Sequence, residues 1–383
     1  MKYTIITSVL ILNLLFAYGC KSNPNNILEN DLIPIELDNI KDSVSFFDFF
    51  SKIEIIPLET INNSLLSQMN FVKVIPYEGF IYILDTKQHL IQKFDSNGKY
   101  ISTINKRGRG PGEYSLLSDF GIDSQNRTIE LLCPTGILNR YTIDEVDFIE
   151  SLTIKDSTKS THLFERLSDD LYIFFSIFND KKLLYYSTKE NKIVKTEYTL
   201  PDYILLKSTL KFALSPFVRF NDTVRFYEGH NGYVYSIDTT SLSISAKYKW
   251  DFGKYSFKLS EIPEYENDIY YYRLSNTISF KYASSFLLCT ESDRFIISNF
   301  NFRGRMMTLA YDKSLNKSHV FHKTKEGVQI FPGYSHKEHH YICIPPKYLS
   351  QFVNKSILSS SQQIVLTTIN SDDNYIILKY TYK

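Results

Sequence analysis

The chain contains little glycine, only one tryptophan and almost no net charge. Glycine numbers 14 among 383 residues, and alanine is also scarce, which argues against a helix-rich or Rossmann-type protein. Lysine plus arginine number 43 and aspartate plus glutamate 42, so no global field attracts nucleic acid or anionic lipid. No apolar run beyond the first twenty residues approaches the ~20 that a membrane-spanning helix needs. We therefore expect no nucleic-acid partner and no span in the mature protein.

Cysteine is also rare. Beyond Cys20 the chain has Cys133, Cys289 and Cys343, each inside an apolar, strand-like run. Three cysteines permit at most one disulfide, and we expect them to act as small buried hydrophobic residues. No CxxC or Cys/His spacing suggests a zinc site. We expect no cofactor, and the sequence leaves open whether a metal binds.

The N-terminus has the parts of a secretory signal. One lysine precedes an apolar stretch over 4–16, and small residues follow it. Ala17-Tyr18-Gly19-Cys20 resembles the lipobox of bacterial lipoproteins. The resemblance implies cleavage before Cys20, a diacylglyceryl thioether on its sulfur and acylation of the new amino group, which together anchor a protein stably to a membrane. The alternative is an ordinary signal peptide with an incidental cysteine.

The domain organisation follows from this start. We expect a signal peptide over 1–19, a lipidated N-terminus with a flexible tether over 20–45, and one folded domain over 46–383. Polar, turn-forming residues directly after Cys20, Lys21 to Asn26, are typical of a tether. No interdomain linker is visible further along.

Aromatic residues are abundant, with 29 Tyr and 28 Phe, and such residues favour strands. A three-strand pattern recurs, most clearly in Phe80–Asp85, Leu90–Asp95 and Lys99–Ile104, where Asn97-Gly98 predicts a type I′ hairpin turn between the last two. Four weaker copies start near Thr128, Leu171, Val224 and Phe295, roughly 43 to 71 residues apart, which overlaps the spacing of propeller blades.

A sixth blade can be assembled from both ends of the chain. Lys52–Leu58 is an early strand without a repeat of its own, and Tyr375–Tyr380 is a late one. Pairing them would close the ring and remove an open sheet edge. We therefore predict an all-β, six-bladed β-propeller with four-stranded antiparallel blades. A short helix is expected over Lys347–Lys355, and an irregular, helical insert over Glu264–Tyr282.

Particular stretches carry a family resemblance. Ile81 to Lys99, Gly108 to Tyr114, Trp250 to Tyr255 and Asn374 to Leu378 resemble the six-bladed β-propeller lipoproteins of Gram-negative bacteria related to NHL-repeat proteins. The resemblance implies the six-bladed fold and a location in the cell envelope, where we expect lipid anchoring at the outer membrane. It implies no activity, because a fold hosts many functions.

The most distinctive candidate site is the loop Asn105–Tyr114. Arg107 and Arg109 could bind a carboxylate or sulfate of a ligand, since guanidinium groups match planar anions. Glycines in the loop could also let backbone N–H groups converge on an anion. The alternative is structural: Glu113 pairs with one of the arginines and the loop bridges two blades. We predict Arg107, Arg109 and Glu113 as ligand-binding residues.

Histidines and strand-end acids are weaker candidates. In an extended strand His336, Glu338 and His340 would share a face, and with His319 and His322 they could hold a metal, although solvated loops more often have this composition. Four acids at or near strand ends could face a central channel or serve as turn residues: Asp85, Asp119, Asp123 and Glu228. No catalytic residue is predicted.

Three functions remain open from the sequence. The first is an envelope module that binds or scaffolds a glycan, a peptide or a protein partner. The second is a metal-dependent propeller enzyme, a lyase or lactonase-like hydrolase. The third, by family analogy alone, is a sensor or accessory subunit beside a nutrient-uptake system. A non-enzymatic binding module is favoured, displayed on either the periplasmic or the outer side.

Overall fold

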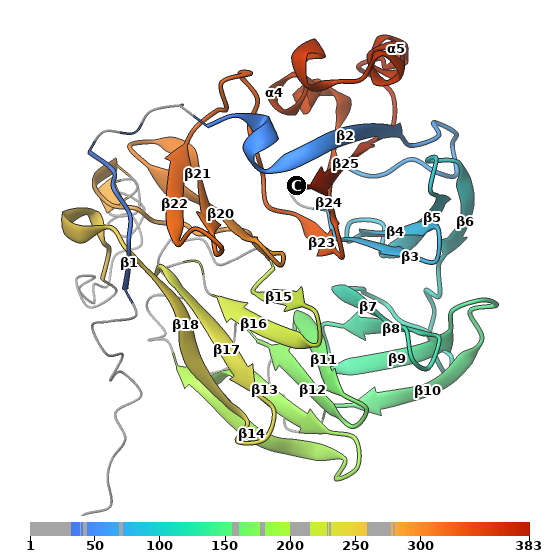
Figure 1. Ribbon diagram of the computed structural model, residues 1–383. Helices are drawn as coiled ribbons and strands as arrows, with labels where there is room; N and C mark the ends of the chain where they lie inside the picture. Colours follow the sequence, from blue (N-terminus) through green and yellow to red (C-terminus); the bar gives the residue numbers. More distant parts are fainter. Residues whose placement is uncertain are drawn as a thin grey trace, which may run out of the picture. The chain divides into compact units, whose positions relative to one another are not determined.

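Strands dominate the protein, as its aromatic composition predicts, and a computed structural model shows how they are arranged (Figure 1). It describes residues 32–383 except 39, 41–43, 69–71, 155–160, 177–180, 200–214, 228, 230, 259–276 and 279. Six sheets surround a central axis, and each contains four antiparallel strands. In five of these blades the four strands follow chain order from the centre outward, whereas an N-terminal strand is outermost in the sixth. The predicted six-bladed β-propeller is therefore confirmed.

The first three blades follow directly along the chain. Blade 1 comprises β3 (Val74–Tyr77), β4 (Phe80–Asp85), β5 (Leu90–Asp95) and β6 (Tyr100–Ile104). Blade 2 comprises β7 (Asp119–Asp123), β8 (Thr128–Cys133), β9 (Ile137–Thr142) and β10 (Phe148–Thr153). Blade 3 comprises β11 (Leu163–Ser168), β12 (Leu171–Phe175), β13 (Lys181–Ser187) and β14 (Lys192–Thr199).

The next three blades include both ends of the propeller. Blade 4 comprises β15 (Phe217–Phe220), β16 (Thr223–Tyr227), β17 (Tyr233–Asp238) and β18 (Ser243–Asp251). Blade 5 comprises β19 (Cys289–Glu291), β20 (Phe295–Phe302), β21 (Arg305–Asp312) and β22 (Lys317–Phe321). Blade 6 comprises β23 (Tyr334–His336), β24 (His339–Ile344), β25 (Ile376–Tyr382) and, outermost, β2 (Phe50–Pro57).

The ring closes as expected, because the N-terminal strand β2 pairs antiparallel with the C-terminal strand β25. The register runs from Phe50 opposite Tyr382 to Pro57 opposite Ile376. Buried aliphatic residues on both strands, including Ile53 and Leu378, belong to the core between blades 5 and 6. This pairing leaves the outer edge of blade 6 to the N-terminal strand.

A fifth strand on blade 4 was not expected. β1 (Leu32–Pro34) pairs parallel with β18, with Ile33 opposite Trp250. The backbone N–H of Ile35 continues the pairing by donating to the Asp251 carbonyl, and the side chains of Ile35 and Leu37 are buried. The propeller therefore begins at Leu32, inside the range 20–45 that the sequence predicts as tether.

Buried clusters fill all six junctions between neighbouring blades, which explains the demand for large aromatic residues. One cluster joins blades 2 and 3 around Tyr172, Phe174 and Tyr186, and another joins blades 4 and 5 around Trp250 and Phe300. A flat ring packed between two sheets covers much apolar area with few rotatable bonds. Most of the Tyr and Phe content of the chain is thus structural.

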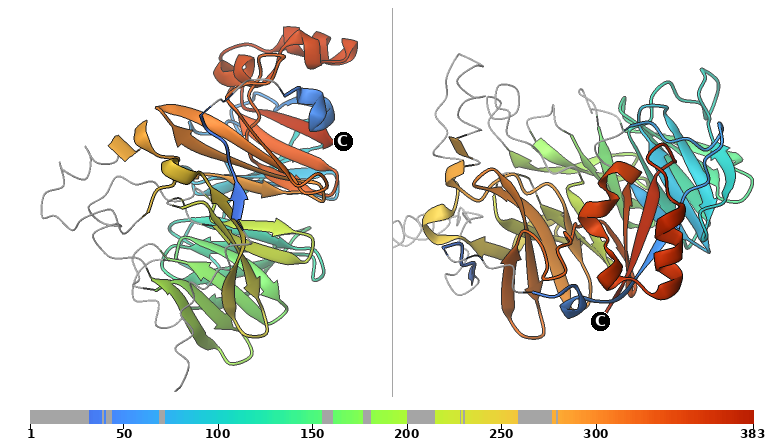
Figure 2. Two further views of the ribbon diagram at one scale, coloured as in Figure 1. Left: turned by 60° about the vertical axis from the view of Figure 1, so that its left-hand side comes forward. Right: turned by 90° about the horizontal axis from the view of Figure 1, so that it is seen from above.

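The short helices lie at the closing blade and at two loops. Between β24 and β25 come η5 (Pro346–Tyr348), α4 (Leu349–Phe352), η6 (Lys355–Ile357) and α5 (Ser360–Thr368), which lie together beside β2 and β25 (Figure 2). η2 (Phe46–Asp48) precedes β2, and η3 (Gly253–Tyr255) follows β18. The helix expected over Lys347–Lys355 is present as three short pieces, whereas most of the insert 264–282 lies outside the described residues.

The hairpin at Asn97-Gly98 is present, but its turn differs from the predicted type I′. Gly98 has φ +86°, whereas Asn97 does not have a positive φ. Three residues separate Asp95 from Lys99, whose carbonyl accepts from the Asp95 N–H, and the pairing register shifts after Lys93. These features are typical of a three-residue hairpin with a bulge at glycine, which needs only one positive φ.

Candidate functional site

The centre of the ring contains a cavity of about 840 Å³. The innermost strand of every blade contributes to its wall, from β3 through β7, β11, β15 and β19 to β23. Segments around η5 and α4 line part of it as well. Cavities of this volume are typical of small-ligand sites, so the geometry points to the centre of the ring as the candidate site.

Lys73 is the first charged residue of this cavity and comes directly before β3. Its Nζ lies 2.7 Å from Oδ1 of Asp119 on β7, and between 5 and 6 Å from the ring centroids of Phe120 (5.7 Å) and Phe164 (5.9 Å). Asp119 also accepts from the backbone N–H groups of Phe120 and Phe164. Blades 1, 2 and 3 are thus joined at one buried carboxylate.

The Asp119 carboxylate has almost no exposed surface, at 1%. Burial raises its pKa, whereas Lys73 and the Phe164 N–H act in the opposite direction. A buried carboxylate with a cation and two amide donors is a preorganised pair. Removing the lysine alone would leave the acid without its cationic partner.

A second charged pair joins blades 3 and 4. Arg219 on β15 places Nη2 2.8 Å and Nε 3.2 Å from Oε2 of Glu165 on β11. Its Nη2 also donates to the carbonyl of Arg166. Tyr334 of blade 6 also lies close to Glu165. Burial, and to a smaller extent the negative charge of Glu165, raise the pKa of Tyr334 to about 12. These groups form a polar part of the cavity wall.

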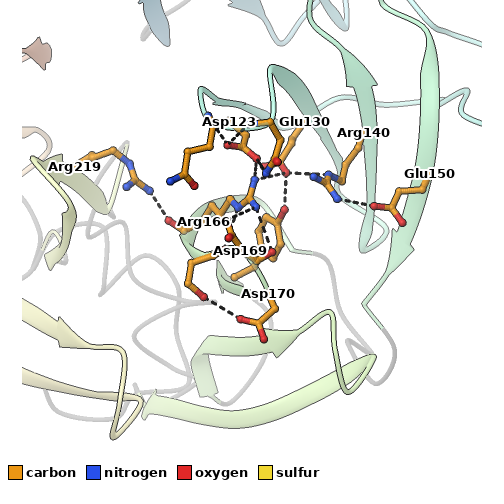
Figure 3. Close-up of polar contacts among 12 residues, drawn as sticks. Asp123, Glu130, Arg140, Glu150, Arg166, Asp169, Asp170 and Arg219 are labelled. Carbon is orange, nitrogen blue, oxygen red and sulfur yellow. Dashed lines mark hydrogen bonds and ion pairs between the residues drawn. The ribbon is translucent and has the colours of Figure 1, made fainter.

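Arg166 also lines the cavity, and it connects Arg219 to blade 2 (Figure 3). Its guanidinium contacts the carboxylates of Asp123 and Asp169. Glu130 on β8 accepts from the hydroxyl of Tyr172 and lies 3.3 Å from Nε of Arg140. Burial raises the pKa of Glu130. These contacts join blades 2 and 3 through paired charges and hydrogen bonds.

Apolar residues make up much of the remaining wall. They come from every blade, for example Ile75, Phe120, Phe217, Leu288 and Ile342, and Phe352 of α4 adds to them. One more charged residue, Lys347 of η5, also lines the cavity. The wall is therefore largely apolar, with a small number of charged side chains distributed around it.

The predicted residues Arg107, Arg109 and Glu113 do not line this cavity. They lie in the loop between β6 and β7, next to a shallow depression of the surface. Oε2 of Glu113 accepts from the Gly110 N–H at 2.7 Å, and within the described residues no ion pair joins Glu113 to either arginine. Both arginines are exposed, and ligand binding at this loop stays a prediction.

The loop does bridge two blades, but it does so through hydrogen bonds and not through the expected ion pair. The buried hydroxyl of Tyr114 donates to the His89 carbonyl of blade 1 at 2.8 Å. The hydroxyl of Tyr141 in blade 2 donates to the Gly112 carbonyl. Gly112 has φ +72° and no room for a Cβ, which would lie 2.3 Å from the Phe148 ring. A side chain at position 112 is thus disfavoured both by the positive φ and by the contact with Phe148.

The histidine segment is not one strand. His336 ends β23, Lys337 takes φ +53°, and His339 pairs opposite His336 in the next strand, so the expected common face of His336, Glu338 and His340 is absent. His340 is buried, with its Nε2 donating to the Phe331 carbonyl at 2.8 Å. His319 packs edge-on against Phe49, and Nδ1 of His322 lies 2.9 Å from the Met306 carbonyl.

The strand-end acids divide between turns and the central cavity. Asp85 accepts from the N–H groups of Ser67, Lys87 and Gln88, and Asp123 from those of Gln125 and Asn126, as turn residues do. Two of the predicted acids contact cations that line the cavity, Asp119 through Lys73 and Asp123 through Arg166. Glu228 lies outside the described residues. In the part of the chain that the structure describes, no group of three metal-ligating side chains is placed to hold a metal ion.

Cys133, Cys289 and Cys343 are free thiols. Cys133 and Cys289 are buried, and burial raises the pKa of Cys133 to about 11 and that of Cys289 further. Cys343 is partly exposed and lines the cavity together with Cys289. All three are poorly ionised at neutral pH and act as small apolar residues, as expected from their runs. Cys20 lies outside the described residues.

A family model described as a domain of unknown function, DUF4934, matches residues 32–381. The chain belongs to the DUF4934 family. The match begins at β1 and ends in β25, so the DUF4934 domain coincides with the whole propeller, including the parallel strand on blade 4. No curated protein matches the sequence.

Solved structures that resemble the DUF4934 propeller include two from Bacteroides. One is a protein of Bacteroides fragilis NCTC 9343 whose name describes it as exported, with TM-score 0.73 and 17% identity over 92% of this chain and 99% of that one. The other is a DUF4221 family member from Bacteroides vulgatus ATCC 8482, with TM-score 0.53 and 10% identity over 87% and 97%. At these identities the likeness establishes the fold alone. Among the described residues, no helix is long and apolar enough to cross a membrane.

Proposed function

We propose that this DUF4934 protein is a lipid-anchored binding module of the cell envelope, and that its ligand binds in the central cavity. One observation carries the proposal: the innermost strands of six blades surround a cavity of about 840 Å³. Its charged groups are fixed by contacts between different blades, as in Lys73 with Asp119 and Arg219 with Glu165. Such groups keep their positions without a ligand, which lowers the cost of binding.

The composition of the wall supports a binding role. Ligand sites combine apolar and aromatic walls with a small number of placed polar groups, and this cavity has both. Burial drives binding of the apolar part of a ligand, and the charged groups orient it.

The envelope location rests on the N-terminus. An apolar stretch over 4–16 precedes the lipobox-like Ala17 to Cys20. The similar structure from Bacteroides fragilis carries a name that describes that protein as exported, which agrees with this proposal. Residues 20–31 would then join the lipid to β1 on blade 4.

Anchoring is tested by fractionating cells that express the full chain or its Cys20→Ala variant. We expect the wild type in the membrane fraction with a fatty-acid label, and the variant without the label and released from the membrane. Ser22→Ala, two residues away, serves as the control and should remain lipidated. A Cys20→Ala variant that keeps its acyl label and its membrane association would overturn the anchor.

Ligand binding in the cavity is tested with a thermal-shift screen of small molecules against the mature domain. Ile122 lines the cavity, and Ile122→Trp should fill part of it and abolish the shifts. Ile101 is an exposed isoleucine on the outer strand β6, so Ile101→Trp provides the matched control and should leave them intact. Hits that survive Ile122→Trp, or a screen of broad chemistry without any hit, would reject the cavity as the binding site.

A further inference from the structure

We propose that Ser335 is a nucleophile for acyl transfer with His340 as its general base, and that the central cavity admits carboxylic esters with an apolar acyl group. This activity goes beyond the proposed function, because it adds a reaction to binding in the same cavity. It needs only that a small ester reaches the cavity wall. Both residues belong to the hairpin of β23 and β24 in blade 6.

Ser335 and His340 lie directly opposite each other in this hairpin. His336 and His339 close it around a two-residue turn, so they exchange backbone hydrogen bonds and the next pair does not. In a pair without such bonds the strands approach more closely, and the two side chains lie nearer to each other. The hairpin thus brings a hydroxyl and an imidazole together on one face of blade 6.

The contacts of His340 fix which ring nitrogen carries the proton. Its Nε2 lies 2.8 Å from the Phe331 carbonyl oxygen, which can only accept, so Nε2 carries the hydrogen of the neutral ring. Nδ1 is therefore the acceptor, and Oγ of Ser335 lies 3.4 Å from it. Contacts between a nucleophile and its base are often this long without substrate and shorten in its presence. The Phe331 carbonyl serves as the third group, which orients the base.

Two further hydroxyls hold the Ser335 oxygen in place at the junction of blades 5 and 6. Oγ1 of Thr290 on β19 lies 2.6 Å from it, and the hydroxyl of Tyr382 on β25 lies 2.9 Å from it. A serine oxygen can accept from two donors and still donate its own proton. Ser335 can therefore donate to His340 while both other hydroxyls keep it in position.

Ser335 is open to the cavity. It is only partly buried and belongs to the cavity wall, as do Thr290 and Phe331. Because its backbone groups face away from β24 and β23 is the innermost strand, the Ser335 N–H points toward the centre of the ring. An N–H group at this place can donate to the oxyanion that forms when Oγ attacks a carbonyl carbon. The largely apolar wall suits an ester with an apolar acyl group.

The reaction proceeds in two steps. Oγ of Ser335 forms a bond to the ester carbonyl carbon while its proton passes to Nδ1 of His340. The bond from that carbon to the alcohol oxygen then breaks, and the alcohol leaves with the proton from Nδ1. In the second step a water molecule attacks the acyl carbon and gives a proton to Nδ1, and Oγ leaves and takes this proton back. One ester and one water thus yield one acid and one alcohol.

His340 can accept a proton over a wide range of pH, because burial lowers its pKa to about 4. Among the described residues, the ionisable side chains that contact it are the phenols of Tyr380 and Tyr382 on β25. Burial raises the pKa of both phenols, so they stay neutral, and Phe50 of β2 on the ring is apolar. The reaction rate should therefore be constant between about pH 5.5 and 8, whereas an unperturbed histidine, with a pKa near 6.5, would make it fall.

The test uses a fluorophosphonate probe and an activated ester, p-nitrophenyl butyrate, because a base of low pKa removes a proton slowly. The probe forms a phosphonyl bond to an activated serine and releases fluoride. Mass spectrometry of the mature wild-type protein should place the adduct on Ser335. Ser335→Ala should abolish the adduct and lower ester hydrolysis at least tenfold. Ser102, on the outer strand β6, is exposed, so Ser102→Ala is the control and should change neither reading.

His340→Gln tests the base. Glutamine can still donate to the Phe331 carbonyl but does not take up a proton, so labelling and hydrolysis should both fall at least tenfold. His319→Gln, at a histidine that packs against Phe49, is the matched control and should leave both rates unchanged. Circular dichroism confirms that each variant is folded. Labelling of the wild type from pH 5.5 to 8 then gives the pH profile.

Several outcomes would overturn acyl transfer by this pair. They are the lack of an adduct, an adduct on another residue, and hydrolysis no faster than in buffer. Unchanged labelling in His340→Gln, or a tenfold fall in rate from pH 8 to 5.5, would exclude His340 as the base. If small molecules shift the melting temperature and Ile122→Trp abolishes the shifts while no adduct forms, the cavity binds ligands and acyl transfer is wrong. If Ser335 reacts but the screen finds no such ligand, the reaction stands and the binding module falls.

Discussion

Nζ of Lys73 lies 2.7 Å from Oδ1 of Asp119 across the junction of blades 1 and 2, where the carboxylate has only 1% of its surface exposed. Removing one partner of such a pair leaves a buried charge uncompensated, which costs about 3–5 kcal/mol. Removing both charges together costs less, because the neutral groups can bond to each other. Comparing the single and the double replacement therefore measures how much of the stability depends on neutralising Asp119.

Lys73→Met should lower the free energy of unfolding by about 3–5 kcal/mol at neutral pH. The Lys73→Gln/Asp119→Asn double variant should lose clearly less than Lys73→Met. The deficit of Lys73→Met should also shrink as the pH falls, because protonation of Asp119 removes its unpaired charge. Urea unfolding at pH 7.5 and pH 5 measures each value. Equal losses in the two variants would show that Asp119 is stabilised without Lys73.

His340 predicts a specific pH dependence of stability. Burial lowers its pKa to about 4, whereas an unperturbed histidine titrates near 6.5. Above pH 6.5 both the folded and the unfolded state hold it neutral, so it has no effect on stability there. Below pH 6.5 the unfolded state gains the proton first, and stability falls until about pH 4, by roughly 3 kcal/mol in total.

His340→Gln checks this sign. Glutamine can still donate to the Phe331 carbonyl but does not titrate, so the variant should be less stable than the wild type at pH 7.5 and approach or pass it at pH 4.5. Chemical unfolding at both pH values gives the difference in free energy of unfolding between the wild type and the variant. The carboxylates are the same in both proteins, so their titration cancels in this difference. A difference that is constant with pH would contradict a depressed pKa at His340.

Two glycines in blade 1 separate backbone strain from steric contact. Gly98 has φ +86° and a Cβ there would lie 2.2 Å from the Pro57 carbonyl oxygen of β2. Gly79 has φ +79° and nothing within 4 Å. Gly79→Ala should cost about 1–2 kcal/mol from the left-handed conformation alone. Gly98→Ala should cost at least about 1 kcal/mol more, since β2 must move. Thermal or urea unfolding gives both values, and equal losses would exclude the contact with β2.

Gln362 protects the outer edge of the closing blade. Its Oε1 accepts from the N–H of Ile55 at 2.6 Å, and α5 packs on β2. Gln362→Ala should cost about 1 kcal/mol and speed amide hydrogen exchange at Ile55. It should also raise the tendency to aggregate, because the strand edge is uncovered. The neighbour Gln363 bonds to carbonyls of Lys355 and Leu358 instead, so Gln363→Ala should leave exchange at Ile55 unchanged.

The sequence predicts the outer three strands of blades 1 to 5 well. Phe80–Asp85 and Leu90–Asp95 match β4 and β5 to the residue, and Leu171 and Val224 start predicted strands that became β12 and β16. The second and third strands of these blades are mostly buried between neighbouring blades, as β4 and β8 are, so they consist of apolar and aromatic runs. The outermost strands, such as β10, are more exposed and are marked by their spacing from the other two. The ring closure was also predictable, since an unpaired strand at each end has an obvious partner.

The innermost strands were not predicted, and neither was the site that they line. They are short, as β19 (Cys289–Glu291) and β23 (Tyr334–His336) show, and β11 has Glu165 and Arg166 at its centre. Short strands with central charges lack the hydrophobic periodicity that marks the outer ones. The charges are present because these strands form the cavity wall. The signal that could have found them is the gap between repeats, which leaves room for one more strand before each copy.

β1 was missed for a related reason. Leu32–Pro34 has three residues and a proline, and its pairing with β18 is parallel. The residues around such a short strand give no signal for it. The strand is stabilised by pairing with β18 at the edge of blade 4, which lies more than 200 residues later in the sequence. The stretch with Arg107 and Arg109 was easy to notice in the sequence because of its glycines. Those glycines have a structural reason, since they allow a tight loop between two blades, as Gly112 shows.

Closure of the ring by β2 and β25 also sets the order in which the protein can fold. Asn374 bonds to Thr60 and Glu59 across 314 and 315 positions of the chain, and the whole of β2 pairs with the last residues. Bringing such distant segments together is slow, because the loop-closure entropy must be lost before the contacts form. Until the C-terminal strand has been synthesised, blade 6 lacks its third strand and β2 has no partner. Blades 1 to 5 can form as the chain emerges, but the ring around the central cavity is completed only when β25 has been made, so a chain that ends before β25 lacks the closed ring.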